Sequence, residues 1–325
     1  MAGGTLNDVI VRLYDLVLQR PLATFKGDAL ALLVETIAFD SAIWASGVHR
    51  TNTIFSIATH NFGPVALMDY AANWQPHDRL RSSVVASPGQ VLRNEDIMPV
   101  AEHRASDIYR RFCAPGGMHQ TLGVATADPI TTVGELFFLF RGGEDAEFSD
   151  EERTAFSTLA PHLFAAWRHR QLAGLLVAGG NDGALPMLTA YAVIDDDGLI
   201  HASDALFSAD VARAFAGWNG PLLPDTLRAA AAGGRTTHVE AGQRFVIRRG
   251  TERHLVIAAD RSDNALTAAE RRTAQLYAEG KTHSAIASKL GLSGSTVRNQ
   301  IAAAYQKLDV HSKVALARIF ARDPS

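Results

Sequence analysis

The chain has 325 residues, of which 47% are apolar and 20% are charged, and its formal net charge at pH 7 is −3. This composition is ordinary for a soluble globular protein and excludes an extensively disordered or collagen-like chain. At roughly one domain per 150 residues, the length predicts two or three domains. The single cysteine, Cys113, excludes an intrachain disulfide and a cysteine-rich zinc site. Because the sequence has neither a membrane-spanning apolar run nor a signal-peptide pattern, we expect a cytoplasmic protein without a membrane partner.

The first long segment, residues 5–178, is predicted to form one α+β domain. Its N-terminal stretch mixes charged and apolar residues as an amphipathic helix does, and residues Phe25–Phe39 lead into a short alternating strand, Asp40–Ser46. Residues Gln120–Ala127 and Gly134–Arg141 are typical of two further strands.

A long helix is predicted to close this domain. Ser149 and Glu152 have the spacing of a capping box, and an apolar stripe follows at helical intervals. Pro161 lacks a backbone N–H, so we expect a kink near Ala160 or a broken helix. The glycine cluster at residues 179–183 is the predicted linker to the next domain.

Several short segments of this region resemble the GAF-like sensor domains attached to many LuxR-type regulators. They are FDSAIWAS, DYAANW and LFFLFRGGEDAEFSDEERTAFSTLAPHL, together with the two terminal helices. An alternative is the acyl-homoserine-lactone-binding domain of quorum-sensing regulators, which is also α/β/α. Its pattern of tryptophan, tyrosine and aspartate is partly echoed here by Trp44, Tyr70 and Trp74.

Large aromatic side chains of this domain are the predicted lining of a small-molecule pocket. Apolar walls with a few polar groups are what such sites need. The competing interpretation is that each of these side chains is an ordinary core aromatic. The candidate pocket residues are Trp44, Phe55, Tyr70, Trp74, Tyr109 and Phe112.

Residues 185–262 are predicted to form a smaller α+β domain whose order of elements resembles a reduced PAS-like domain. The aspartates Asp195, Asp196 and Asp197 are similar to the acidic pocket of a phosphorylated receiver, but no later strand with a phosphoacceptor and a partner lysine follows, so phosphorylation control is not expected. The predicted elements are a hairpin of Ala190–Asp195 and Leu199–His201, helices near Ala209–Trp218 and Leu223–Ala232, and strands Thr236–Glu240, Arg244–Arg249 and His254–Ala259.

The last segment, residues 264–325, is predicted to form a four-helix domain. It has nine basic and four acidic residues, and a basic segment on an acidic body suggests a polyanionic partner. Thr267 and Glu270 have the capping-box spacing at the start of the first helix. A second helix is expected to run from about Thr282 to Leu290 and to stop at Gly291. The third has Val297, Ile301, Tyr305 and Leu308 on its inner face, and the fourth begins near Ser312.

Two short helices joined by a tight glycine turn form a helix-turn-helix layout, in which the second helix enters the major groove of DNA. Arg298 can pair with guanine or clamp a phosphate, Asn299 can pair with adenine, and the small Ala302 permits close approach. We expect the remaining candidate residues to contact phosphates and thereby to set the register of the domain on the duplex. These are Ser293, Ser295, Thr296, Lys281, Lys289 and Lys307.

The stretch from Leu266 to Phe320 resembles the LuxR/FixJ-type helix-turn-helix family over nearly its full length. The resemblance departs at Arg298, Gln300 and Lys313, and only Gln300, where histidine is usual, changes the chemistry. It implies a domain that dimerises and reads a roughly two-fold site in double-stranded DNA. The matching positions are Leu266, Thr267, Glu270, Leu276, Gly280, Ile286, Ala287, Leu290, Leu292, Ser293, Thr296, Val297, Lys307, Leu308 and Val310.

The sequence therefore predicts an α+β multidomain protein with a GAF-like sensor at 5–178, a PAS-like unit at 185–262 and an all-α helix-turn-helix domain at 264–325. We expect a homodimeric transcription regulator that responds to a small-molecule effector. No nucleotide-binding or nucleophile-elbow motif occurs, and His162 and His169 are too far apart on their helix for a metal pair, so no enzyme activity, cofactor or metal is expected. The rivals are an enzyme with a vestigial tail and a protein-interaction module that uses the PAS-like unit.

Overall fold

The computed structural model describes residues 5–143, 145–178, 190–250, 253–259 and 266–307, together with residues 313, 316, 317 and 320. The predicted linker at 179–183 lies outside these residues.

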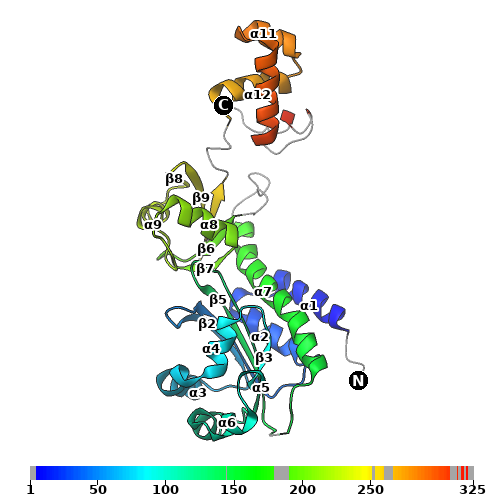
Figure 1. Cartoon of the computed structure of the whole chain (residues 1–325), viewed down its shortest axis with the longest axis vertical. Coiled ribbons are helices and arrows are strands. Elements are labelled where there is room, and N and C mark those ends of the chain that lie inside the picture. The colour runs from blue at the N-terminus through cyan, green and yellow to red at the C-terminus, as the bar shows by residue number, and fades with distance from the viewer. Residues whose placement is uncertain are drawn as a thin grey trace. The chain divides into compact units, whose positions relative to one another are not determined.

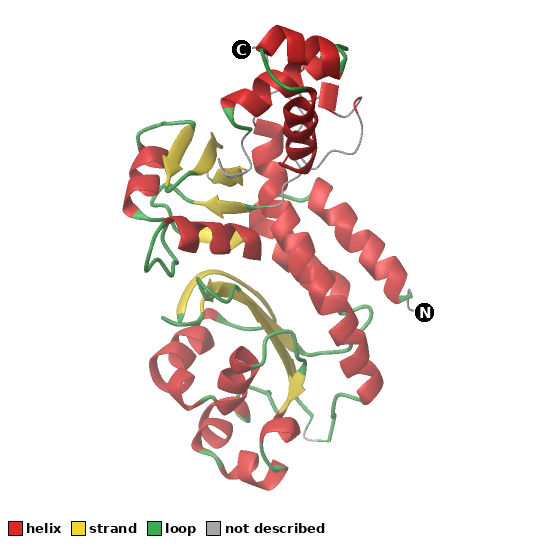
Figure 2. Ribbon diagram, turned by 45° about the horizontal axis from the view of Figure 1, so that its top comes forward, coloured by secondary structure: helices red, strands yellow, loops and turns green. Residues whose placement is uncertain are grey.

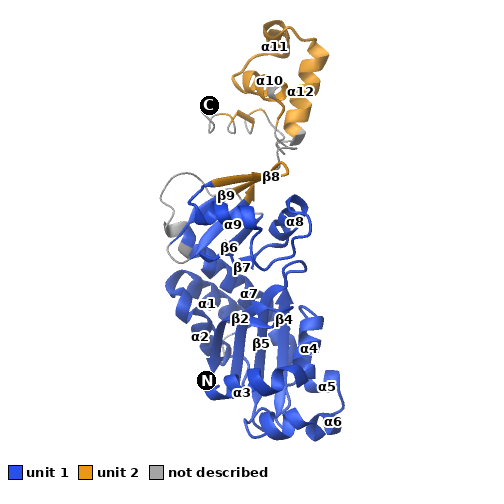
Figure 3. Cartoon of the chain, turned by 90° about the vertical axis from the view of Figure 1, so that its left-hand side faces the viewer, with its two compact units in different colours: residues 1–236, 246–257 blue, residues 237–245, 258–325 orange. Residues whose placement is uncertain are grey.

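The chain divides into two units, which Figure 3 distinguishes by colour. The first is Met1–Thr236 with Val246–Ile257, and the second is Thr237–Phe245 with Ala258–Ser325. Within the described part of the chain, no helix is both long and apolar enough to cross a membrane.

The first unit contains a five-stranded antiparallel sheet with the strand order β2-β1-β5-β4-β3. Helices α1, α2 and α7 cover one face of this sheet, and the short helices between β2 and β4 cover the other (Figure 1 and Figure 2). Its elements are α1 (Leu6–Gln19), α2 (Leu22–Leu33), β1 (Ser41–Val48), β2 (Thr53–His60), α3 (Pro64–Asp69), η1 (Tyr70–Trp74), η2 (Gln75–His77), α4 (Arg79–Ala86), β3 (Leu92–Arg93), α5 (Asn94–Ile97), α6 (Val100–Ala105), η3 (Tyr109–Cys113), β4 (Gln120–Ala127), β5 (Val133–Arg141) and α7 (Asp150–Ala178).

The alternation of side chains along β1 and β5 separates two apolar clusters. Trp44 and Phe137 point to the α1/α2/α7 face, where their rings stack with centroids 5.2 Å apart. Ile43 and Phe138 point to the opposite face and pack below α4. Both strands are therefore largely buried on both faces, and β5 contains the continuous apolar run Leu136–Phe140.

The structure confirms the strands predicted at Asp40–Ser46, Gln120–Ala127 and Gly134–Arg141 to within two residues at each end. Strand β2 and the helices between residues 64 and 113 were not predicted. Those helices have three to eight residues each, which is too short for a helical period to show in the sequence.

The predicted capping box begins helix α7, since the Ser149 N–H donates to Glu152 Oε2 at 2.9 Å and the Glu152 N–H donates to Ser149 Oγ at 3.2 Å. Of the two alternatives predicted at Pro161, a kink or a broken helix, the broken helix is wrong, because α7 is continuous through Pro161 for 29 residues. Pro161 is exposed, whereas Leu159 and Leu163 on either side of it are buried against the sheet, and this packing holds the helix together.

The second sheet has the strand order β7-β6-β10-β9-β8. At the hairpin between β6 and β7, Asp195 accepts backbone hydrogen bonds from Asp197 and Leu199 and a hydrogen bond from His201 Nε2 at 2.9 Å, so Asp195 stabilises a turn. The C-terminal end of α7 packs on this sheet through Leu172 and Leu175. The elements are β6 (Tyr191–Ile194), β7 (Ile200–Ser203), α8 (Ala205–Ala214), α9 (Asp225–Ala232), β8 (Thr237–Glu240), β9 (Gln243–Arg249) and β10 (His254–Ala259).

A buried ion pair lies between the first sheet and its helices. Lys26 of α2 is 3% exposed and Glu135 of β5 is 8% exposed, and Lys26 Nζ lies 3.1 Å from Glu135 Oε2. Glu135 also accepts hydrogen bonds from Trp44 Nε1 at 2.7 Å and Ser46 Oγ at 2.8 Å. Burial lowers the pKa of Lys26, and the charge of Glu135 opposes that shift. The ammonium also lies 4.6 Å from the ring centroid of Trp167 on α7, so this pair joins three elements of the fold.

We expect Lys26→Met to reduce the free energy of unfolding by about 3–5 kcal/mol, because the carboxylate of Glu135 stays buried without a counter-charge. The double variant Lys26→Met/Glu135→Leu removes both charges and should cost less than the sum of the two single variants. Urea unfolding followed by tryptophan fluorescence measures the free energy of unfolding of the wild type, Lys26→Met, Glu135→Leu and the double variant. Strictly additive costs would contradict the proposed coupling.

Candidate functional site

A cavity of about 150 Å³ lies between the first sheet and the short helices that cover its outer face. An apolar cavity of that size in a protein core holds a benzene-sized molecule. Its floor comes from β1, β4 and β5 and its walls from α4, η1 and η3. The apolar lining includes Ile43, Ala45, Leu80, Met98, Phe112, Met118, Leu136, Phe138 and Phe140.

A tyrosine–aspartate pair lies among the polar groups that line this cavity. The Tyr70 hydroxyl donates to Asp78 Oδ2 at 2.7 Å, and Asp78 Oδ1 accepts from the backbone N–H of Arg81 at 2.9 Å at the start of α4. Burial and the charge of Asp78 raise the pKa of Tyr70 well above its usual range, so the phenol stays protonated. Both side chains line the cavity, where a bound molecule would find an acceptor oxygen in an apolar setting.

Asp78 was not among the predicted pocket residues. Asp78 is the N-terminal cap of α4, a helix that was not predicted from the sequence, so nothing there singled this residue out. Its second role depends on the fold, because η1 brings Tyr70 to its free carboxylate oxygen.

The structure brings together four of the six predicted pocket aromatics, on the two π-helical turns η1 and η3. Tyr70 and Phe112 line the cavity, and Trp74 stacks on Phe112 with centroids 6.2 Å apart. The buried Tyr109 lies beside them, with its hydroxyl 2.7 Å from His119 Nδ1. Turns of this kind are frequent at functional sites.

The other two predicted pocket residues do not line this cavity. Trp44 lies on the opposite face of the sheet, because successive side chains of β1 point to opposite faces and Trp44 stands between Ile43 and Ala45. Phe55 lies on β2, and its ring contacts His201 of the second sheet with centroids 4.4 Å apart.

In the second unit, the helix-turn-helix consists of α11 (His283–Leu290) and α12 (Gly294–Lys307), preceded by α10 (Ala268–Ala278). Gly291 has φ +67°, the left-handed conformation that ends α11 and turns the chain. Ile286, Val297 and Ile301 are buried between the helices. The capping box at Thr267 is confirmed, since the Thr267 N–H donates to Glu270 Oε2 at 2.7 Å and the Glu270 N–H donates to Thr267 Oγ1 at 3.2 Å.

The outer side of α12 is exposed as predicted within this unit, with Ser295, Arg298, Asn299 and Ala302 all open to solvent. Ser293 caps the helix, since its hydroxyl accepts from the Thr296 N–H at 3.1 Å. Lys289 is exposed and Lys281 is half-buried on the neighbouring helix and turn. The side chain of Lys307 and residue Leu308 lie outside the described residues.

Gln300 replaces the usual histidine of the family pattern and connects two helices. Its Oε1 accepts a hydrogen bond of 2.6 Å from the hydroxyl of Thr273, which is fully buried on α10. This bond fixes the rotation of α12 against α10 without placing Gln300 on the exposed side.

Cys113 should react slowly with iodoacetamide in the folded protein. Burial and the nearby Asp78 raise the pKa of this thiol to about 12, so little thiolate is present at pH 8. We expect alkylation at least about tenfold slower than in the urea-unfolded chain, and because the chain has one cysteine, intact-mass spectrometry reads the rate directly. Equal rates in the two states would contradict a closed, apolar cavity at this position.

Comparisons with known proteins agree with the helix-turn-helix geometry. Residues 264–320 match the family described as bacterial regulatory proteins, luxR family. No curated protein matches the chain in sequence.

Three solved structures show weak similarity. The VqsR LBD domain from Pseudomonas aeruginosa has a TM-score of 0.40 and 16% identity, over 52% of this chain and 97% of that one. CepR2 from Burkholderia cenocepacia, described as an N-acylhomoserine lactone dependent LuxR family transcription factor, has a TM-score of 0.38 and 15% identity, over 52% and 93%. SdiA of Escherichia coli has a TM-score of 0.38 and 12% identity, over 96% and 95%.

All three TM-scores lie below 0.5. The prediction of a LuxR-type helix-turn-helix is confirmed. The C-terminal segment, residues 264–320, is a luxR-family domain of the kind found in bacterial regulatory proteins.

Proposed function

We propose that the chain is a transcription regulator that binds DNA through α12 and responds to a small molecule held in the cavity of the first unit. The observation that carries the proposal is the exposed Arg298/Asn299 side of α12 within a luxR-family domain. Neither side chain has a hydrogen-bond partner among the described residues, so both are available to base edges or phosphates.

The proposed contacts divide into base readers and phosphate contacts. Arg298 and Asn299 would read bases, and Ala302 leaves room for the helix to approach the groove floor. The hydroxyls of Ser293, Ser295 and Thr296 and the cations of Lys281, Lys289 and Lys307 would hold phosphates and set the register. A homodimer would place two such helices in adjacent major grooves.

Helix α7 supports the coupling part of the proposal. Phe156, Leu159 and Leu163 of this helix pack on the inner face of the first sheet, while Leu172 and Leu175 pack on the second. A ligand that binds more tightly to one arrangement of these contacts than to another would shift the population between them. In a dimer, that shift would change the spacing of the two recognition helices.

We also propose identities for the two domains that precede the helix-turn-helix, and a location in the cell. A five-stranded antiparallel sheet covered on both faces suits a GAF-like sensor at 5–178, and the second sheet suits a PAS-like unit at 185–262. A cytoplasmic location suits a protein whose partner is double-stranded DNA.

The second candidate for the effector is an acyl-homoserine lactone. The cavity favours it in one respect, because the carboxylate of Asp78 could accept from an amide N–H while the aromatic walls pack against an acyl chain. A lactone of this class carries no charge.

Arg298→Ala should weaken specific DNA binding by about 1–3 kcal/mol and relax the base preference at one position of each half-site. Lys289→Ala should instead weaken binding to all sequences alike and reduce the dependence of log K on log salt by about one unit. Fluorescence anisotropy with a selected duplex and a scrambled duplex at several salt concentrations separates the two effects. If Arg298→Ala leaves both duplexes bound as before, the role of Arg298 is wrong.

The neutral probe 4-phenylbutan-1-ol should raise the melting temperature of the wild-type protein, because its benzene ring matches the size of the apolar cavity. Ala45→Phe should abolish that shift, since Ala45 faces the cavity and a phenyl group there fills it. Ala229→Phe, the same change at an exposed position of α9, is the matched control and should keep the shift. An equal shift in all three proteins would place the probe elsewhere.

A further inference from the structure

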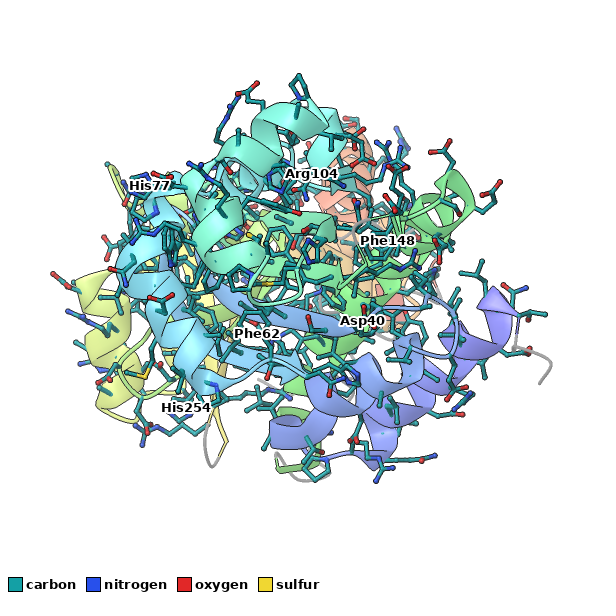
Figure 4. All side chains as sticks on the ribbon, turned by 90° about the horizontal axis from the view of Figure 1, so that it is seen from below. Asp40, Phe62, His77, Arg104, Phe148 and His254 are labelled. Atoms are coloured by element: carbon teal, nitrogen blue, oxygen red, sulfur yellow. The ribbon has the colours of Figure 1, made fainter. Side chains whose placement is uncertain are left out.

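A second, polar cleft of about 550 Å³ adjoins the apolar cavity. Residues of α3, η1 and η2 form one side of this cleft and residues 106–111 the other. His77, Ser106 and Ile108 line both spaces, so the cleft lies at the mouth of the cavity. Figure 4 shows His77 toward the edge of the molecule and Phe62, on the cavity lining, nearer its middle.

Both carboxylates of the cleft have partners within the chain. Asp69 accepts hydrogen bonds from Asn73 Nδ2 at 2.7 Å and from Trp74 Nε1 at 2.9 Å. Asp107 is paired with Arg110 at 2.9 Å.

The cation of the cleft, Arg111, has no carboxylate partner in the part of the chain that the structure describes. The Arg111 guanidinium lies over the Trp74 ring, 5.3 Å from its centroid, and forms no ion pair with any described residue. The His77 ring is exposed and likewise has no hydrogen-bond partner in the described ranges. Arg111 is therefore the one cation in the described lining of this cleft, and without an ionic partner it suits an acceptor with negative charge.

The π-helical turn η3 links the two spaces through consecutive residues. Arg111 faces the polar cleft, whereas Phe112 lines the apolar cavity, and the ring of Trp74 contacts both side chains. One molecule could therefore place an apolar part against Phe112 and a charged group against Arg111.

We propose that the effector is an amphipathic monocarboxylate, with its apolar body in the cavity and its carboxylate held by Arg111 at the mouth. A carboxylate matches the two parallel N–H donors of one guanidinium. A doubly charged phosphate would fit less well, because Asp69 and Asp107 lie in the same cleft. This inference rests on the proposed ligand-binding function, and it distinguishes the effector from a neutral lactone.

The test compares 4-phenylbutyrate with 4-phenylbutan-1-ol, which share their apolar part and differ in charge. Isothermal titration of the full chain at pH 7.5 measures both probes on the wild type, on Arg111→Gln and on Arg12→Gln. The last variant makes the same charge change on α1, where Arg12 pairs with Glu35 outside the cleft. Far-UV circular dichroism confirms that each variant is folded.

We expect the wild type to bind the carboxylate about tenfold more tightly than the alcohol, the gain of one charge-assisted contact. Arg111→Gln should lose that preference and keep its affinity for the alcohol, Arg111→Lys should restore part of it, and Arg12→Gln should behave as the wild type. Equal affinity of the wild type for both probes, or an unchanged preference in Arg111→Gln, would overturn the proposal. If neither probe binds any of the proteins, the ligand-binding function itself fails, and this inference fails with it.

Discussion

The strict alternation of side chains along β1 and β5 is the constraint on which the first unit depends. It places Trp44 and Phe137 on one face and Ile43, Ala45 and Phe138 on the other. The first face is filled by α7 and its neighbours, whose packing includes the buried Lys26–Glu135 pair. The second is covered by short helices joined by π-helical turns, which pack less completely and leave a cavity. One face thus supplies stability, and the other supplies a site.

Helix α7 connects the first sheet to the second. It extends beyond the first sheet and packs its last turns on the second, so a change at the first sheet has a continuous, buried route to the second. The capping box at Ser149 and the buried residues around Pro161 keep the helix in one piece, which a relay of this kind requires. The carboxylate of Glu135 lies at the same interface, because it binds Trp44, Ser46 and Lys26 together.

Features that depend on neighbouring residues could be predicted from the sequence, whereas features that depend on contacts between distant residues could be predicted only in part. The helix-turn-helix follows local rules, namely a capping box at Thr267, a left-handed glycine at Gly291 and a serine cap at Ser293, so its layout could be predicted residue by residue. The central strands could be predicted from local patterns, and for β1 that pattern was a short alternating segment. The cavity could be predicted only in part. Tyr70 and Phe112 were named, whereas Asp78 was missed because the helix that it caps, α4, was itself not predicted. Trp44 was placed in the pocket because composition does not say which face of a strand a side chain takes.

The central claim is that the exposed side of α12 reads duplex DNA. Selection of binding sites by the full-length chain from a random duplex library measures this most directly, because it requires no knowledge of the operator. If α12 reads DNA in this way, the selected duplexes will carry an enriched, roughly two-fold symmetric sequence whose half-sites have centres about 10 base pairs apart. Library DNA that stays random after repeated rounds, with binding that depends on salt alone, would contradict it.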